Sequence, residues 1–210
     1  MVSFLPMDFG QRLNAILGGR TRVAVIRALC EMPAGYAATG REIARRAAIN
    51  HPLELAVLSD LADHGLVRRA RVGRADTYEL NRSHVLSETL CSLFRHEAAA
   101  RSDLLSFLGN QISAHAPSAA DAYLFGSVAE DGGTAASDID IALVWPGASD
   151  RQIEQASESI SEAVRLRYGN KAQVLVWTTP IPERELRGAW KSVIGHGIRL
   201  VSKRSGRKRR

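Results

Sequence analysis

Two short motifs, Gly126-Ser127 and Asp138-Ile139-Asp140, constrain this chain more than any other part of its sequence. Side chains two positions apart on a β-strand share a face, so the two aspartates are placed to hold a hard, oxygen-preferring cation. Mg²⁺ fits, because it takes one or two carboxylates and keeps positions for water and substrate phosphates. The apolar run at 122–125 predicts a strand that ends in a Gly-Ser turn, where backbone amides and a hydroxyl approach phosphate. The pattern indicates phosphoryl-transfer chemistry; the alternative is a plain turn followed by a solvated strand start.

This arrangement resembles the minimal nucleotidyltransferases of the DNA polymerase β-like superfamily, whose signature is Gly-Ser, a loop of about this length and Asp-x-Asp. The resemblance covers roughly residues 97–201 and implies a small mixed-sheet domain. It implies that Gly126 and Ser127 bind the phosphates of a nucleoside triphosphate, with ATP expected. It also implies that Asp138 and Asp140 are the catalytic acids and hold Mg²⁺ ions, which clamp the attacking and leaving oxygens.

One departure from the family concerns a third carboxylate on the next strand, expected here over Lys171–Thr179. The matching position is Gln173, whose neutral amide is a poorer metal ligand and cannot act as a general base. The loop residues Glu130-Asp131 add two negative charges where relatives often carry Arg to meet phosphate. We therefore expect nucleotide binding, with transfer slow or lost.

The first ninety residues carry a separate pattern of helical and strand signals. We expect three helices and a hairpin, in chain order Thr21–Cys30, a helix opened by the capping box Thr39-Gly40-Arg41-Glu42, a helix from Asn50 to Gly65, and two strands within Leu66–Leu80 around a turn at Gly73. Leu55, Leu58 and Leu61 form the expected buried stripe of the third helix. Its expected outward residues are His51, Leu53, Glu54, Ala56 and Ser59. This order predicts a winged helix-turn-helix.

The stretch from Leu58 to Asn81 resembles transcription regulators of the ArsR or MarR type. The resemblance implies that the third helix enters the DNA major groove while the hairpin wing follows the backbone or minor groove. The candidate DNA-binding residues are His51, Ser59, Arg68, Arg69, Arg71 and Arg74. The alternative is a winged helix kept for dimerisation or protein contact.

The chain is expected to be α/β in the α+β sense, with a winged helix at 1–88, a nucleotidyltransferase-like domain with its leading helix at 89–202, and a basic disordered tail at 203–210. The net charges of residues 1–90, 91–201 and 202–210 are +3, −3 and +6. A basic tail binds DNA nonspecifically or aids solubility. The helical apolar stripe near Leu86–Phe94 predicts a homodimer.

Further expectations concern location and cysteines. No apolar run approaches a membrane span and the first residues lack a secretory signal, so the expected location is cytoplasmic. Cys30 and Cys91 are expected to be buried small apolar residues, with a redox pair at a dimer interface as the alternative. The histidines form no ligand-spaced cluster.

These observations predict a DNA-binding transcription regulator whose nucleotidyltransferase-like domain binds a Mg²⁺–nucleoside triphosphate, with double-stranded DNA and a second copy of the chain as partners. The alternative is an active nucleotidyltransferase that the winged helix targets to a protein, nucleic acid or small-molecule hydroxyl. A third possibility is an antitoxin that represses its own operon and neutralises a partner toxin.

Overall fold

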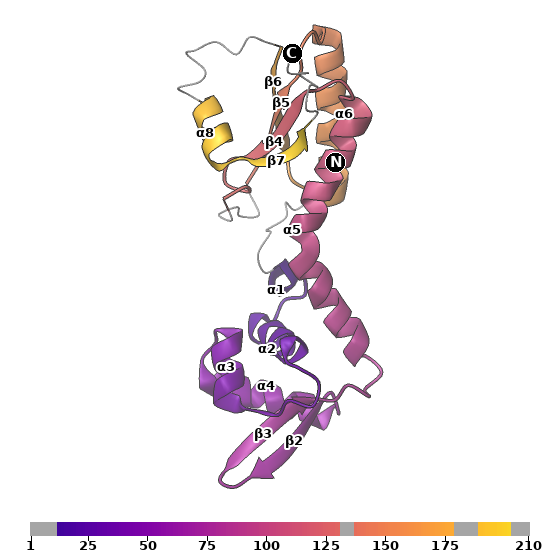
Figure 1. Cartoon of the computed structure of the whole chain (residues 1–210). Coiled ribbons are helices and arrows are strands. Elements are labelled where there is room, and N and C mark those ends of the chain that lie inside the picture. Colours follow the sequence, from indigo (N-terminus) through magenta and orange to yellow (C-terminus); the bar gives the residue numbers. More distant parts are fainter. Residues whose placement is uncertain (1–11, 131–136, 179–188, 203–210) are drawn as a thin grey trace, which may run out of the picture. The chain divides into compact units, whose positions relative to one another are not determined.

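The computed structural model describes residues 12–130, 137–178 and 189–202, which form two compact units that divide between Ala99 and Ala100 (Figure 1). Each unit has its own sheet and its own hydrophobic core. Asp131 of the phosphate-side loop and the basic tail at 203–210 lie outside the described residues.

The N-terminal unit is a winged helix-turn-helix, as the sequence predicts. Its elements are α1 (Arg12–Ile16), α2 (Arg20–Glu31), β1 (Ala38–Thr39), α3 (Gly40–Ala47), α4 (His51–Asp63), β2 (Val67–Val72) and β3 (Ala75–Leu80). The strands form an antiparallel sheet in the order β1-β3-β2. Thr39 caps α3 by accepting a hydrogen bond from the backbone of Glu42. Asn50 occupies the N-cap position of α4, but its side chain makes no capping bond.

Helix α4 is rotated relative to the orientation expected from its sequence. Leu58 and Leu61 are buried as expected, but Leu55 is 42% exposed and Glu54 is fully buried. The inner stripe is therefore Glu54, Leu58 and Leu61, whose spacing of four and three residues places them on one side of a helix. Leu55 follows Glu54 by one position, about 100° around the helix. The expectation that Glu54 faces the DNA is wrong.

Helix α5 (Ser87–His115) begins in the N-terminal unit, where it packs against α1 and α2. Glu97 accepts hydrogen bonds from the backbone N–H of Leu13 at 2.8 Å and from Arg27 Nε at 2.9 Å. Cys91 on α5 and Cys30 in the last turn of α2 form a disulfide. Cys91 is buried as expected, but the expectation that the two cysteines are no more than buried small apolar residues is wrong, because folding brings these two helices together across a sequence separation of 61 residues.

The C-terminal unit is built on a four-stranded mixed sheet with helices on both faces. The remaining part of α5 belongs to this unit with β4 (Asp121–Phe125), β5 (Ile139–Val144), α6 (Asp150–Tyr168), β6 (Ala172–Trp177), α8 (Ala189–His196) and β7 (Ile198–Ser202). The strand order is β6-β5-β4-β7; β5 and β6 are parallel and the other pairs antiparallel. The observed architecture is α+β in both units, as the sequence predicts.

The two faces of this sheet differ in what covers them. One face packs Leu124, Ile141 and Leu143 against α5 and α6, and this layer is the main core of the unit. On the other face Ala142 packs against Trp190 and Val193 of α8. Alternate residues of a strand point to opposite faces, so Asp140 shares its face with Ala142.

Within the described ranges, no helix combines the length and apolar character needed to cross a membrane.

Candidate functional site

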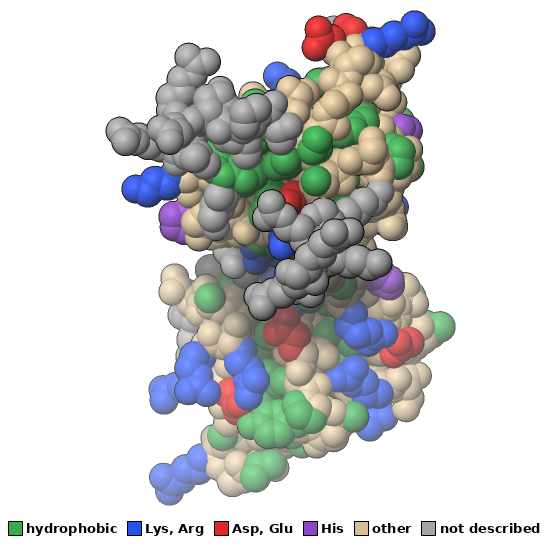
Figure 2. All heavy atoms as spheres, turned by 45° about the horizontal axis from the view of Figure 1, so that its top comes forward, with side chains coloured by type: hydrophobic (Ala, Val, Ile, Leu, Met, Phe, Trp, Pro, Cys, Tyr) green, Lys and Arg blue, Asp and Glu red, His purple; other side chains and the backbone are tan. Residues whose placement is uncertain are grey.

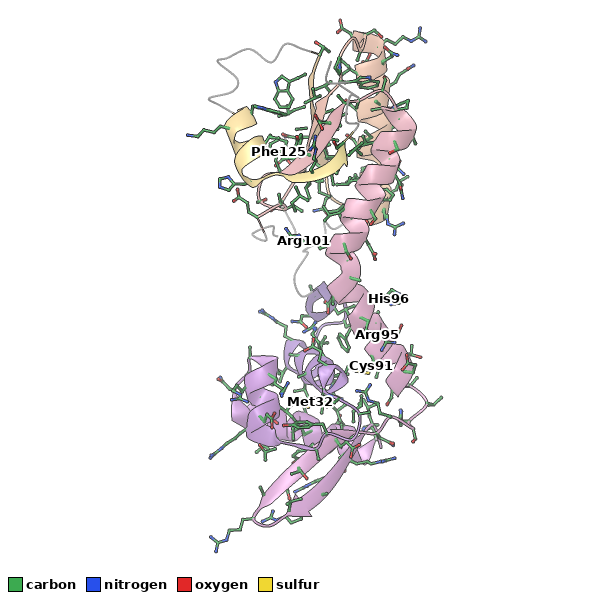
Figure 3. All side chains as sticks on the ribbon, in the orientation of Figure 1. Met32, Cys91, Arg95, His96, Arg101 and Phe125 are labelled. Carbon is green, nitrogen blue, oxygen red and sulfur yellow. A yellow bond between two sulfur atoms is a disulfide. The ribbon has the colours of Figure 1, made fainter. Side chains whose placement is uncertain are left out.

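Gly126 and Asp140 lie against each other where β4 ends and β5 begins. Phe125, the last residue of β4, is labelled in Figure 3. It pairs in register with Asp140. Gly126 follows with a φ of 74°, and a Cβ added there would overlap Asp140 Oδ2. A residue with a side chain would be strained at this φ and would also displace the carboxylate. The antiparallel register thus joins the two motifs that the sequence separates by a loop.

The start of β5 is held by the chain that follows α6. Asn170 is fully buried, and its Nδ2 donates a hydrogen bond to Ser137 O at 3.0 Å. The backbone N–H of Ile139 donates to Lys171 O at 2.9 Å. These two bonds flank Asp138, which is half-buried and directly precedes β5. The backbone on both sides of Asp138 is therefore fixed before any ligand binds.

The turn after β4 is braced by α5. Ala129 N donates to Gly126 O at 3.0 Å, which closes one turn around Ser127. Arg101 on α5 donates through Nη2 to Ala129 O at 2.5 Å (Figure 3). Val128 is buried in the turn whereas Ser127 is exposed. The structure thus leaves the Ser127 hydroxyl at the surface, where a phosphate can reach it.

The two aspartates are suited to a cation. Burial, and secondarily the charge of Asp138, raise the pKa of Asp140 above its ordinary value of 3.8. A bound cation would offset both effects. Two carboxylates are enough for one Mg²⁺ that also takes water and phosphate oxygens. No group of three or more His, Cys, Asp or Glu side chains among the described residues could hold a metal ion by itself.

Gln173 stands directly beside Asp140 on the same face of the sheet. The two residues are partners in the parallel register of β5 and β6, and Gln173 is exposed. A carboxylate at this position would complete a three-acid set with Asp138 and Asp140. The amide contributes only a neutral carbonyl oxygen as a ligand.

Trp190 is a core residue of this unit. It is 6% exposed and makes edge-to-face contacts with Tyr123 and Trp177, with ring centroids at 5.7 and 5.0 Å. These contacts attach α8 to the sheet face that carries Asp140. Its burial leaves the ring unavailable for stacking on a nucleotide base.

The six candidate DNA-binding residues do not form one surface. Arg69 and Arg71 share the sheet face of Tyr78 and both pair with Asp76, which the register places opposite Arg71. Their guanidinium groups hold the pKa of Asp76 below its ordinary value, Arg69 first. Arg68 alternates to the opposite face of the hairpin.

The other candidates lie at the hairpin turn and on α4. Arg74 belongs to the turn between β2 and β3, and Ser59 on α4 is half-buried. His51 starts α4, and its side chain lies outside the described set. Arg side chains are prominent on the surface of the winged-helix unit (Figure 2).

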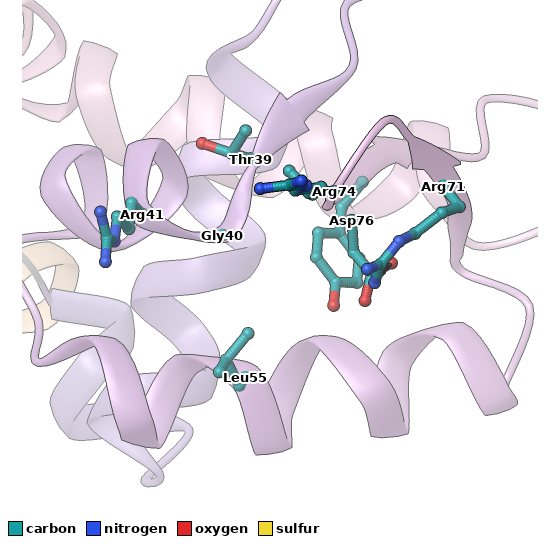
Figure 4. Close-up of a pocket in the computed structure, with 9 residues that line it drawn as sticks. Thr39, Gly40, Arg41, Leu55, Arg71, Arg74 and Asp76 are labelled. Carbon is teal, nitrogen blue, oxygen red and sulfur yellow. Dashed lines mark hydrogen bonds and ion pairs between the residues drawn. The ribbon is translucent and has the colours of Figure 1, made fainter.

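A groove of about 490 Å³ separates the hairpin from the start of α3 and from α4 (Figure 4). It is lined by Thr39, Gly40, Arg41, Leu55, Arg71, Arg74, Ala75, Asp76 and Tyr78. The three arginines against one aspartate make it cationic, and the exposed Leu55 forms part of its wall. Sequence reasoning missed Arg41 and Leu55 because nothing in their local spacing points to the hairpin.

The family model of the nucleotidyltransferase domain matches residues 110–192. The match contains both aspartates, the Gly-Ser turn and Gln173. We refer to this unit below as nucleotidyltransferase-like. No curated protein matches the chain.

Several solved structures resemble parts of the chain. A mutant of the toxin–antitoxin MntA-HpeT is 17% identical, covering 48% of this chain and 74% of that one, with a TM-score of 0.35. A toxin–antitoxin with AMP-PNP is 20% identical, covering 45% and 70%, with a TM-score of 0.34. A MarR family transcriptional regulator from Silicibacter pomeroyi is 19% identical, covering 52% and 75%, with a TM-score of 0.35. At these scores the likeness carries no assignment of function.

The contact between Gly126 and Asp140 leads to a first prediction. Gly126→Ala should destabilise the protein by about 2–3 kcal/mol, because it adds left-handed strain and a clash with the carboxylate. Gly147→Ala is a matched control: Gly147 has a φ of 73°, and an added Cβ would meet nothing within 4 Å. It should cost only the strain, about 1 kcal/mol. Equal losses in urea unfolding would show that the contact with Asp140 contributes nothing.

Proposed function

We propose that this protein is a DNA-binding regulator whose nucleotidyltransferase-like unit binds a Mg²⁺–nucleoside triphosphate as a ligand rather than turning it over rapidly. The observation that carries the proposal is the composition of one sheet edge. Asp140 lies against Gly126, as a phosphate and metal site requires, while its neighbour in register is Gln173 instead of an acid. This edge therefore keeps the residues that we propose to bind phosphate and Mg²⁺ but has an amide where the expected base would stand.

In this proposal each residue of the site has a separate role. Asp138 and Asp140 hold Mg²⁺, which when bound neutralises the phosphate oxygens of the nucleotide. The backbone at Gly126 and the hydroxyl of Ser127 bind phosphate, because the turn has no side chain in the way. Asn170 and Arg101 keep the aspartates and the turn in place through their backbone contacts. ATP is the nucleotide we expect.

The winged-helix unit is proposed to bind double-stranded DNA through the cationic groove and its hairpin. Arg41, Arg71 and Arg74 line the groove, and Arg68 extends the basic surface to the other face of the hairpin. Guanidinium groups bind phosphate oxygens well, and backbone contacts of this kind dominate DNA affinity. Glu54 is buried, so its carboxylate does not lie on the surface that α4 would present to the phosphates.

A homodimer is proposed through the start of α5. Leu93 lies on α5 and Leu86 directly precedes the helix, seven residues earlier. Leu86 is 54% exposed, Leu93 is 38% exposed, and Val85 next to Leu86 is 84% exposed. Phe94, by contrast, is buried against α1 and α2. Residues seven apart fall on the same side of a helix, so the exposed leucines form a stripe that a second copy would cover. Paired winged helices would then read two half-sites.

The proposal is tested by titrating the purified protein with each nucleoside triphosphate, with and without Mg²⁺, while pyrophosphate release is followed. We expect Mg²⁺-dependent binding with little or no release. DNA affinity is then measured with and without the nucleotide that binds best. Failure to bind any nucleoside triphosphate in the presence of Mg²⁺ would refute the proposal that this unit binds a nucleotide as a ligand.

The second candidate function is an active nucleotidyltransferase, and the specific observation in its favour is the family match over residues 110–192. Pyrophosphate release in the same titration would select it. The acceptor would be a hydroxyl of a protein, nucleic acid or small molecule, and a partner toxin is one protein acceptor to test. The winged helix would then direct the transferase to its target.

Gln173→Asp should strengthen metal binding, because it places a third carboxylate beside Asp140. Without Mg²⁺ the added charge should lower the melting temperature, and saturating Mg²⁺ should raise it by more than in the wild type. Any slow pyrophosphate release should also increase, by about 10-fold or more. Gln173→Asn keeps the position neutral and should leave all three quantities near wild type. A Mg²⁺ response of Gln173→Asp equal to that of Gln173→Asn would contradict the assignment.

A further inference from the structure

The disulfide between Cys30 and Cys91 lies inside the winged-helix unit and joins α2 to α5. The two Cα atoms are 5.1 Å apart, within the range that a disulfide spans without moving the backbone. Cys91 is 2% exposed and packs in the core, whereas Cys30 is half-buried. The two sulfurs therefore differ in access: a small reagent reaches Cys30 first.

A guanidinium group lies against this pair. Arg82 Nη1 donates to Cys91 Sγ at 3.4 Å (Cys91 and Met32 are labelled in Figure 3). Its Nη2 donates to Met32 O at 2.8 Å and to Cys30 O at 3.3 Å. The two carbonyl contacts anchor the guanidinium at the end of α2, so that it stays beside the sulfur of Cys91. In the reduced protein that sulfur would be a thiol or thiolate.

This arrangement favours the thiolate of Cys91. Arginine remains protonated at all relevant pH values, and a fixed positive charge next to a cysteine stabilises its ionised form. Burial in an apolar core by itself would have the opposite effect. A purely structural thiol in the core needs no cation beside it. The contact with Arg82 instead stabilises the thiolate, which is the form of cysteine that attacks another sulfur.

We propose that Cys30 and Cys91 form a reversible dithiol–disulfide site that exchanges with low-molecular-weight disulfides, with Arg82 stabilising the attacking thiolate of Cys91. In the first step the Cys30 thiolate attacks one sulfur of the small disulfide, which releases one small thiolate and leaves a mixed disulfide on Cys30. In the second step the Cys91 thiolate attacks Cys30 Sγ and releases the second small thiolate. Two protein thiols are oxidised and one small disulfide is reduced to two thiols.

The expected consequence is a redox-dependent stability of the DNA-binding unit. The bridge closes a loop between residues 61 apart and fixes the start of α5 to α2. Cross-linking a loop of this length restricts the unfolded chain and stabilises the folded one. The oxidised protein should therefore melt about 10 °C or more above the reduced protein. Both cysteines, Arg82, α2 and the start of α5 belong to the same unit, so the effect is local to it.

The test equilibrates the full-length reduced protein with graded ratios of oxidised to reduced glutathione. Free thiols are then alkylated, and the products are identified by intact mass and peptide mapping. We expect a peptide pair linked through Cys30 and Cys91, a loss of two alkylation sites in one cooperative step, and full reversal by excess reduced glutathione. Cys91→Ser should stop at a glutathione adduct on Cys30. Cys30→Ser cannot form the bridge, and its remaining Cys91 should form a glutathione adduct more slowly than Cys30 does in Cys91→Ser.

Arg82 variants test the role of the cation. Arg82→Met should slow the closing step by about 10-fold, and Arg82→Lys should recover most of the rate by restoring the charge. A structural role alone would not separate Met from Lys in this rate. Melting of the reduced variants identifies any that fail to fold. Two results would overturn the proposal: two alkylated cysteines at every glutathione ratio, or equal closing rates for Arg82→Met and Arg82→Lys in folded protein.

Discussion

Replacing Asp138 and Asp140 together with asparagine should lower Mg²⁺-dependent nucleotide affinity more than about 100-fold. This expectation follows because ligand residues should matter at least as much as the surrounding groups, whose loss costs about 10–100-fold in metal affinity. Binding is measured by calorimetric titration with ATP at saturating Mg²⁺ and again with chelator. The wild type should lose its affinity in chelator, whereas the double variant should give the same weak binding in both conditions.

The same change should make the ligand-free protein more stable at neutral pH. Burial and the neighbouring Asp138 raise the pKa of Asp140 in the folded state, so its ionised form is disfavoured there. The stability that Asp140 contributes is fully present below its ordinary, unfolded pKa of 3.8 and is lost as the pH rises through the higher folded pKa. An asparagine side chain in its place does not ionise; the variant should therefore melt above the wild type at pH 7 and lose this advantage below about pH 4.

A control variant and a check of folding accompany the double variant. Asp150→Asn removes one acid from the exposed start of α6 in the same unit and should change neither nucleotide affinity nor its Mg²⁺ dependence. A double variant that melts above the wild type at pH 7 is folded, so that its failure to bind nucleotide cannot come from unfolding. Unchanged nucleotide affinity in a folded double variant would place the nucleotide elsewhere in the molecule.

The second large effect concerns DNA. Arg71→Ala combined with Arg74→Ala should weaken binding to a mixed-sequence duplex by about 10–100-fold near 0.15 M salt. Each phosphate contact that is lost should reduce the slope of log K against log salt by about 0.9, so the pair should reduce it by about 2. Fluorescence anisotropy over a salt series measures both quantities. Arg69 still pairs with Asp76 in this variant, which preserves an ion pair on the hairpin.

The matched control removes the same charge from the other unit. Arg151→Ala combined with Arg165→Ala changes two residues of α6 whose side chains are exposed or paired with Glu162. This variant has the net charge of the hairpin variant but keeps the groove intact. Its salt slope should equal that of the wild type. If the two double variants bind DNA equally well, affinity depends on overall charge and the groove is not the interface.

Local sequence patterns were sufficient to predict the main elements of both units. Hydrophobic spacing predicted α2, α4 and the hairpin, because the periods of a helix and a strand depend only on neighbouring residues. The apolar run before Gly126-Ser127 predicted where β4 ends, and the Asp-x-Asp motif predicted where β5 begins. The resemblance to nucleotidyltransferases pointed to Gln173 as the position of the third carboxylate, and the parallel register of β5 and β6 places this residue beside Asp140.

How those elements face one another depends on contacts between residues far apart in the chain. The rotation of α4, which buries Glu54 and exposes Leu55, depends on its packing against α2, α3 and β2, because a stripe shifted by one residue is almost equally periodic. The pairing of Cys30 with Cys91 and the approach of Arg82 required α2, the end of β3 and α5 to meet in space. The same reason explains why Gly126 touches Asp140: an antiparallel register joined residues that no local rule connects.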